Sequence, residues 1–117
     1  MEYMLLIMGD ETRMNAATRE DEAGMSPEYA AYNEALIKAG AMRGGKRLRP
    51  TSATTSVRVR DGKAVVLDGP YAETQEQLGG FYLIDVPDLD AALDWARRLP
   101  AAQFGTVEVR PVWPTGT

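Results

Sequence analysis

The sequence predicts an α+β fold in which an antiparallel sheet of five strands carries two helices on one face. The chain has 117 residues, enough for one hydrophobic core, so residues 1–117 are expected to form a single domain. Short apolar or alternating runs, typical of strands, occur together with two stretches of helical periodicity. An Asp-Gly pair between two of the runs predicts a β-hairpin.

The first strand is expected at Tyr3–Met8, because successive apolar positions are typical of a central strand covered on both faces. Residues 10–24 are polar and lack helical periodicity, so they are expected to form a loop or a frayed turn, and a loop of this length is a candidate lid. The first helix is expected to begin at Pro27, with Ser26 as its capping residue, and to end near Ala39.

The segment after the first helix contains the clearest local signal in the chain. Gly44–Gly45 is expected to break the chain, and Leu48–Pro50 is expected to be an extended connector. Thr54–Arg60 then alternates apolar and polar residues, Asp61–Gly62 is the preferred type I′ turn, and Lys63–Leu67 returns. These residues predict a hairpin.

A two-residue turn fixes the register of this hairpin. Val57 is then expected opposite Val66, and Thr55 opposite Asp68. Residues of one alternation share a face, so Asp68 is expected on the same side as Val57, Val59 and Val66. An acid in this place either caps the following turn or serves a pocket, and both roles are open at this point.

The remaining elements complete the sheet. Phe81–Val86 reads as another strand, residues 88–99 as a helix with an apolar stripe and an Asp88 cap, and Thr106–Val112 as an alternating last strand. Without the first hairpin arm, Thr54–Arg60, the order is βαββαβ, the ferredoxin-like unit. That arm is expected to add a fifth strand at the sheet edge.

The unit is expected to be a homodimer. Two helices cover one face of the sheet, yet the strands are apolar on both alternations, so the second face needs another subunit. We expect two sheets packed face to face, with about 800 Å² buried per partner, the usual size of a specific interface.

Composition limits the chemistry. The chain has no cysteine and no histidine, so thiolate chemistry is excluded and the commonest neutral-pH base and metal ligand are absent. No ligand spacing suggests a metal site, and no glycine-rich loop has a phosphate-binding spacing, so no metal or cofactor is expected. The longest apolar run is too short to span a bilayer and lacks the flanks of a signal peptide, so we expect no membrane contact and a cytoplasmic location.

Charge is unevenly distributed along the chain. The net charge of −4 argues against nucleic acid as a partner. Six cations and no acid lie between Arg43 and Arg60, either as a solvated surface or as a rim that attracts anions. This stretch has no aromatic residue to stack on a base, which also argues against nucleic-acid binding.

Three motifs together resemble a known family. Asp68–Thr74 (DGPYAET), Glu76–Tyr82 (EQLGGFY) and Val107–Val112 (VEVRPV) are similar to the DGPF-domain proteins of the YCII-related family, and the similarity runs from Met4 to about Val112. Tyr71 stands where that family usually has phenylalanine. The resemblance implies a dimeric α-β barrel of ferredoxin-like subunits.

The resemblance implies little about activity. Most such proteins look like bacterial proteins without an assigned reaction, one relative is a dehydrochlorinase of a hydroxylated chloroaromatic, and some resemble companions of extracytoplasmic-function sigma factors. Other branches of the family carry a His and an Asp on the first helix that look like an acid/base pair. The corresponding positions here are Tyr29 and Lys38, so a mechanism that needs this pair does not carry over.

Two functions remain open. As an enzyme, the chain is expected to hold a small hydroxyaromatic or anionic metabolite in a cleft between the sheet and the first helix, with carboxylate acid/base chemistry. The candidate site residues are two possible bases, Asp68 and Glu73, and four ligand-binding residues, Arg49, Pro70, Tyr71 and Arg110.

The alternative is a dimeric module that binds a metabolite or a protein partner without chemistry, with a possible link to sigma-factor regulation. In that case Asp68 caps its turn, Glu73 is solvated, and Glu108 and Arg110 pair across the dimer interface. The absence of histidine and cysteine favours this alternative slightly.

Overall fold

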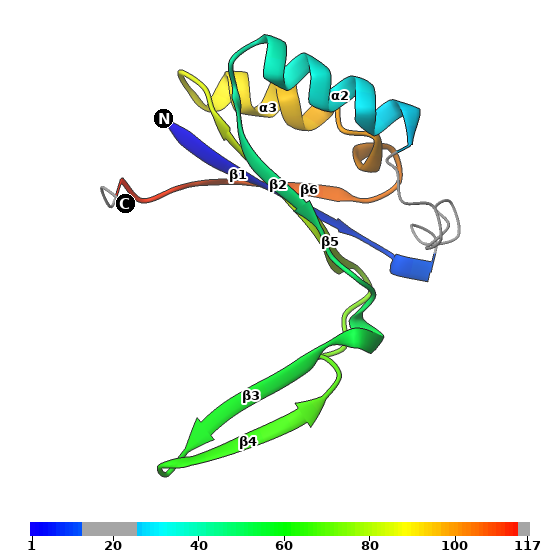
Figure 1. Ribbon diagram of the computed structural model, residues 1–117, viewed down its shortest axis with the longest axis vertical. Coiled ribbons are helices and arrows are strands. Elements are labelled where there is room, and N and C mark those ends of the chain that lie inside the picture. Colours follow the sequence, from blue (N-terminus) through cyan, green and yellow to red (C-terminus); the bar gives the residue numbers. More distant parts are fainter. Residues whose placement is uncertain (13–25, 115–117) are drawn as a thin grey trace.

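The computed structural model describes residues 1–12 and 26–114. A four-stranded antiparallel sheet, with two helices on one face, forms the body, and a two-stranded hairpin projects from it (Figure 1). The body strands are β1 (Glu2–Gly9), β2 (Met42–Arg47), β5 (Gln77–Asp85) and β6 (Thr106–Pro111), and the helices are α2 (Pro27–Lys38) and α3 (Leu89–Arg97). The strand order β2-β5-β1-β6 is that of a ferredoxin-like sheet.

Strand β1 occupies the centre of the sheet, as predicted. It pairs with β5 on one side and with β6 on the other. Tyr3, Leu5 and Ile7 are buried under the helices. The opposite side of the sheet, which we call the open face, carries the half-buried side chains of Met4, Leu6, Met8 and Leu83.

Helix α2 begins and ends where the capping residues predict. The backbone N–H of Tyr29 donates to the Ser26 hydroxyl at 3.4 Å, and Gly40 takes a positive φ of 72° just after the helix. Tyr32 and Leu36 are its buried residues. Most of the loop and candidate lid predicted for residues 10–24 lies outside the described residues.

The prediction that Gly44–Gly45 breaks the chain is wrong. Both glycines lie in β2, an edge strand that pairs with β5 across a bulge between Met42 and Gly44. A Cβ atom on Gly45 would lie 3.0 Å from the carbonyl oxygen of Phe81 and 3.0 Å from the ring of Tyr82. Glycine is therefore present because the two strands approach closely, and not because the strand ends.

The hairpin has the predicted register but not the predicted place. Strands β3 (Thr55–Arg60) and β4 (Lys63–Asp68) pair with Val57 opposite Val66, and Asp61 and Gly62 have positive φ angles of 54° and 76°. They form a separate two-stranded sheet, so the expected five-stranded sheet is wrong. The reason is that β2 already occupies the edge of β5, which makes the hairpin an insertion between two body strands.

The second half of the body follows the sequence closely. The Asp88 carboxylate accepts the Ala91 N–H at 2.9 Å and caps α3, whose residues Ala92 and Ala96 are buried. A short 3₁₀ helix, η2 (Pro100–Gln103), then leads into β6. No helix in the described ranges is long and apolar enough to cross a membrane.

Candidate functional site

A cavity of about 610 Å³ lies between the sheet and the first turns of α2, next to η2. This volume is within the usual range of small-molecule pockets, roughly 300–1,000 Å³. Much of its wall is apolar. These apolar residues come from β1, β2, the segment after β2, β5 and the η2 region: Ile7, Met42, Leu48, Leu78, Ala101 and Phe104. The cleft predicted between the sheet and the first helix is therefore present.

Glycine residues of two neighbouring strands also line the cavity. Gly45 of β2 and Gly79 and Gly80 of β5 form part of its wall. A Cβ atom on Gly80 would lie 2.7 Å from the carbonyl oxygen of Lys46, so this position accepts only glycine unless β2 moves. The close pairing of β2 with β5 thus shapes this side of the cavity.

Two tyrosines, Tyr29 of α2 and Tyr82 of β5, line the cavity. The Tyr82 hydroxyl donates to the side-chain oxygen of Asn33. Burial raises the pKa of Tyr82 to about 12, with Tyr29 acting in the same direction and the hydrogen bond to Asn33 acting against both. Burial also raises the pKa of Tyr29, although the Ala101 backbone and the charge of Arg47 oppose it. Both phenols are therefore neutral near pH 7.

An aromatic cluster holds Tyr82 in place. The ring of Tyr32 packs edge-to-face against Tyr82, with 5.3 Å between centroids, and against Trp95, with 5.9 Å. The Tyr32 hydroxyl donates to the Trp95 carbonyl at 2.8 Å. Because Tyr82 is fixed by Tyr32 on one side and by Asn33 at its hydroxyl, it forms a rigid part of the cavity wall.

The rim of the cavity carries more positive than negative side chains. Lys46, Arg47 and Arg49 line it together with two acids, Glu11 and Glu28. Since all three cations are exposed at the mouth, the rim favours an incoming anion.

One of the two acids is already bound by the protein. The Glu11 carboxylate accepts the Thr51 backbone N–H at 2.9 Å and also accepts from the Thr51 hydroxyl. The backbone N–H of Glu11 donates to the Gln77 side chain at 3.0 Å. Glu11 therefore connects the end of β1 to the connector that precedes the hairpin, and its carboxylate is already engaged by two donors of Thr51.

The comparison with protein families identifies the family of this chain. The sequence profile of the YCII-related domain matches residues 1–115. The chain belongs to the YCII-related family. An uncharacterized protein of Rhizobium meliloti (strain 1021) is 41% identical over 114 residues, which cover 96% of this chain and 92% of that protein. The resemblance inferred from the sequence motifs is thus confirmed at the level of the family, and neither comparison assigns a reaction to this YCII-related chain.

The predicted site residues are not all brought together in this YCII-related chain. Of the six, Arg49 lines the cavity. Four others, Asp68, Pro70, Tyr71 and Glu73, are exposed at the end of β4 and in the loop that follows, outside the cavity lining. Arg110 is exposed on β6, on the open face of the sheet.

The loop after β4 is organised by its backbone and by ring stacking. The N–H of Gly69, at a φ of 98°, donates to the Thr54 carbonyl at 2.7 Å, and the Gly69 carbonyl accepts from the Ser56 hydroxyl at 2.8 Å. The guanidinium carbon of Arg58 lies 4.3 Å from the centre of the Tyr71 ring. The family motif therefore closes the base of the hairpin.

Sequence reasoning missed several residues of the cavity. Tyr29 was named only as the counterpart of an acid/base position in other branches, and Tyr82, Lys46 and Arg47 were not singled out as site residues. The excess of cations between Arg43 and Arg60 was the available signal, because three of those six cations line the cavity. Lys38, the second of the two positions at which other branches carry an acid/base pair, lies outside the lining.

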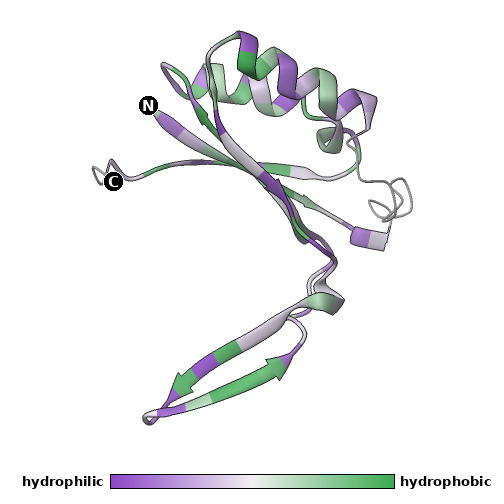
Figure 2. Cartoon of the chain, in the orientation of Figure 1, coloured by the Kyte–Doolittle hydropathy of each residue, from purple (hydrophilic) through white to green (hydrophobic). Residues whose placement is uncertain are grey.

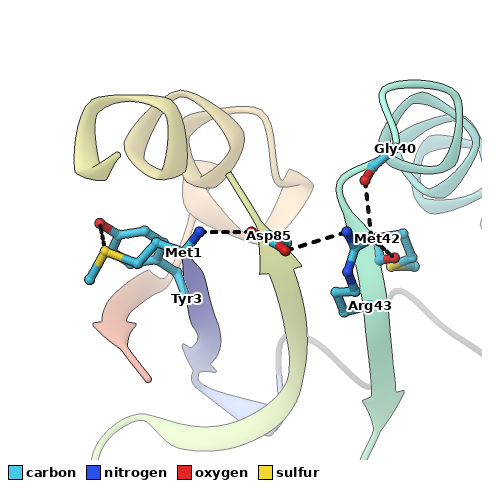
Figure 3. Close-up of polar contacts among 6 residues, drawn as sticks. All are labelled: Met1, Tyr3, Gly40, Met42, Arg43 and Asp85. Carbon is cyan, nitrogen blue, oxygen red and sulfur yellow. Dashed lines mark hydrogen bonds and ion pairs between the residues drawn. The ribbon is translucent and has the colours of Figure 1, made fainter. Parts of the chain in front are cut away.

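Arg43, another of these cations, has a structural contact at the far end of the sheet (Figure 3). Asp85, at the end of β5, accepts from the N-terminal ammonium group of Met1 at 2.8 Å and from Arg43 at 3.4 Å. The hydrogen bond from the N-terminal ammonium group is the largest influence that holds the pKa of Asp85 below its usual range. These contacts connect the ends of β1, β2 and β5. Among the described residues, no cluster of three or more metal-ligating side chains is present.

Proposed function

We propose that this chain binds an aromatic acid in the cavity between α2 and the sheet. The observation that carries the proposal is the combination of an apolar cavity of about 610 Å³ with a cationic rim. Ligand pockets typically join an apolar wall to a few polar groups that fix the orientation of the ligand.

The cavity offers a separate contact for each part of such a ligand. An aromatic ring would pack against the apolar wall, including Phe104 and Leu78. A carboxylate would lie at the rim, within reach of Arg47 and Arg49, because guanidinium groups bind carboxylates through two parallel hydrogen bonds. A phenolic or carbonyl oxygen would accept a hydrogen bond from the neutral Tyr29 hydroxyl.

Catalysis is the second candidate, and the geometry supports it less. Asp68 and Glu73, the predicted bases, are exposed and lie outside the cavity lining. Of the two carboxylates that do line the cavity, Glu11 is held by Thr51. Acid/base chemistry by Asp68 or Glu73 therefore remains a prediction that requires a ligand outside this cavity.

The proposed assembly is a homodimer. Support comes from the open face, where Met4, Leu6, Met8 and Leu83 are half-buried on the side of the sheet away from the helices. A second copy packed on this face would complete their burial, as in other proteins that cover an apolar sheet face with a subunit.

The test is a thermal-shift screen with aromatic carboxylates and their uncharged amide analogues, followed by calorimetry. A ligand at a hundred times its dissociation constant is expected to add ~2.7 kcal/mol of stability. The double variant Arg47→Gln/Arg49→Gln should bind the acids more weakly by about tenfold or more, because the charge-assisted contacts of both arginines to the carboxylate are lost.

The matched control removes two cations of the hairpin, with Arg60→Gln/Lys63→Gln, and should leave binding unchanged because neither residue lines the cavity. Equal loss of binding in both double variants would show a nonspecific charge effect. No response to any acid in the parent protein would contradict the proposal.

A further inference from the structure

No residue of the β3–β4 hairpin is buried. All of β4 is exposed, and in β3 only Ser56 and Arg58 are half-buried. The hairpin extends away from the body, on the side of the sheet opposite the helices (Figure 1), and Figure 2 shows hydrophobic residues along much of β4. An isolated two-stranded hairpin is marginally stable in water. A surface that covers its apolar residues would therefore stabilise it.

The two faces of the hairpin differ in how far the chain itself covers them. One face carries Ser56, whose hydroxyl is bonded to the Gly69 carbonyl, and Arg58, which stacks on Tyr71. The other, which we call the valine face, carries Val57, Val59 and Val66, with 65%, 61% and 63% of their surface exposed. The valine face is therefore the more exposed side, since Val65 and Leu67 on the other face are 45% and 44% exposed.

We propose that the hairpin is a dimerisation arm whose valine face packs against a second copy of this chain. The first argument is the position of the hairpin, and it rests on the homodimer proposed above. The hairpin projects on the open-face side of the sheet (Figure 1), where that homodimer places the second copy. In a twofold dimer each copy offers one arm and receives one, so the contact is made twice, which helps to reach the roughly 800 Å² per partner of a stable interface.

Charge also favours a second copy as the occupant. The hairpin carries three cations, Arg58, Arg60 and Lys63, against two acids, Asp61 and Asp68, whereas the whole chain has a net charge of −4. A cationic arm is therefore attracted to the acidic body of another copy. Since the cations lie at the turn or on the face opposite the valines, they do not have to be desolvated when the valine face is buried.

The base of the arm is fixed before any partner binds. The Leu48 N–H donates to the Gly79 carbonyl at 2.9 Å, and Glu11 holds the Thr51 backbone and hydroxyl. A surface that is held in place loses less conformational entropy on association. The arm is thus preorganised to present its valine face.

Two neighbouring residues of β4 provide the test, since Val66 lies on the valine face and Val65 on the opposite one. Sedimentation velocity over a concentration series measures the dimer dissociation constant for Val66→Glu and for Val65→Glu, and circular dichroism checks that both remain folded. We expect Val66→Glu to raise this constant by about tenfold or more and Val65→Glu by less than about threefold. A monomeric parent protein at about 100 μM, or equal effects of the two variants, would overturn the proposal.

A second measurement remains informative if the glutamate variants fail to fold. The chain has no cysteine, so Val59→Cys and Val65→Cys each introduce one unique thiol for a photoreactive label. The proposal expects a cross-linked species of twice the 12.8 kDa chain mass from the Val59→Cys protein and little from the Val65→Cys protein. Absence of this species from the Val59→Cys protein, at concentrations where the parent is dimeric, would refute the role of the hairpin in dimerisation.

Discussion

Replacing Gly45 by alanine tests both the assignment of β2 and the wall of the cavity. The new Cβ would lie 3.0 Å from the Phe81 carbonyl oxygen and 3.0 Å from the Tyr82 ring, so one of them has to move. The Phe81 oxygen belongs to the β2–β5 pairing, and the Tyr82 ring is held by Tyr32 and Asn33. Neither neighbour moves without loss, so we expect destabilisation of ~1–3 kcal/mol, the usual cost of overpacking.

Gly44→Ala is the matched control, because a Cβ atom on Gly44 meets nothing within 4 Å. This variant should be neutral or stabilising by roughly 0.4–1 kcal/mol, since alanine reduces the entropy of the unfolded chain. Urea unfolding followed by circular dichroism and tryptophan fluorescence gives both free energies of unfolding. If Gly45→Ala is as stable as Gly44→Ala, the close contact between β2 and Tyr82 is wrong.

Three further predictions concern the hairpin, a cavity tyrosine and the end of the sheet. Gly62→Val should reduce the free energy of unfolding in urea by about 1 kcal/mol or more, because Gly62 has a φ of 76° that β-branched residues tolerate poorly; no measurable loss would mean that the turn is misassigned. Burial raises the pKa of Tyr82 from 10.0 to about 12, so the folded chain keeps a proton that the unfolded chain loses, and stability should decline above pH 10. That decline should be smaller in Tyr82→Phe, and an identical pH profile from pH 9 to 12 would contradict it. The pKa of Asp85 is lowered, so the effect has the opposite sign: the ionised carboxylate stabilises the fold above its ordinary pKa of 3.8 and this contribution is lost as the pH falls. Thermal melts should therefore show a larger fall in melting temperature on acidification for the parent than for Asp85→Asn, which has no carboxylate to protonate.

The features that the sequence predicted correctly depend on residues close together in the chain. Ser26 and Asp88 cap the helices that follow them, and the Asp61–Gly62 turn fixes the hairpin register. In each case the decisive contact spans at most three residues, or follows directly from a two-residue turn. Side-chain chemistry and backbone preference are sufficient for such contacts.

The errors concern contacts between distant segments. Met42–Arg47 has no alternation of apolar residues, and it becomes a strand only because β5 offers it an edge. Once β2 pairs with β5, the hairpin is excluded from that edge, which local patterns do not reveal. The same displacement separates Asp68 and Glu73 from the cavity, because the place of the hairpin relative to the body decides which side chains meet.

The glycines that concealed β2 are also the residues that shape the cavity. Gly44–Gly45 and Gly79–Gly80 look like interruptions, yet Gly45, Gly79 and Gly80 line the cavity on paired strands. Glycine positions on these paired strands leave space between the sheet and α2 that larger side chains would fill. A break in the apolar pattern of a sheet strand can therefore indicate a ligand pocket, and here it is accompanied by the cations Lys46 and Arg47 on the same strand. The sequence signal for this site is thus the combination of glycine pairs and adjacent cations, and not the acidic motif that carries the family resemblance.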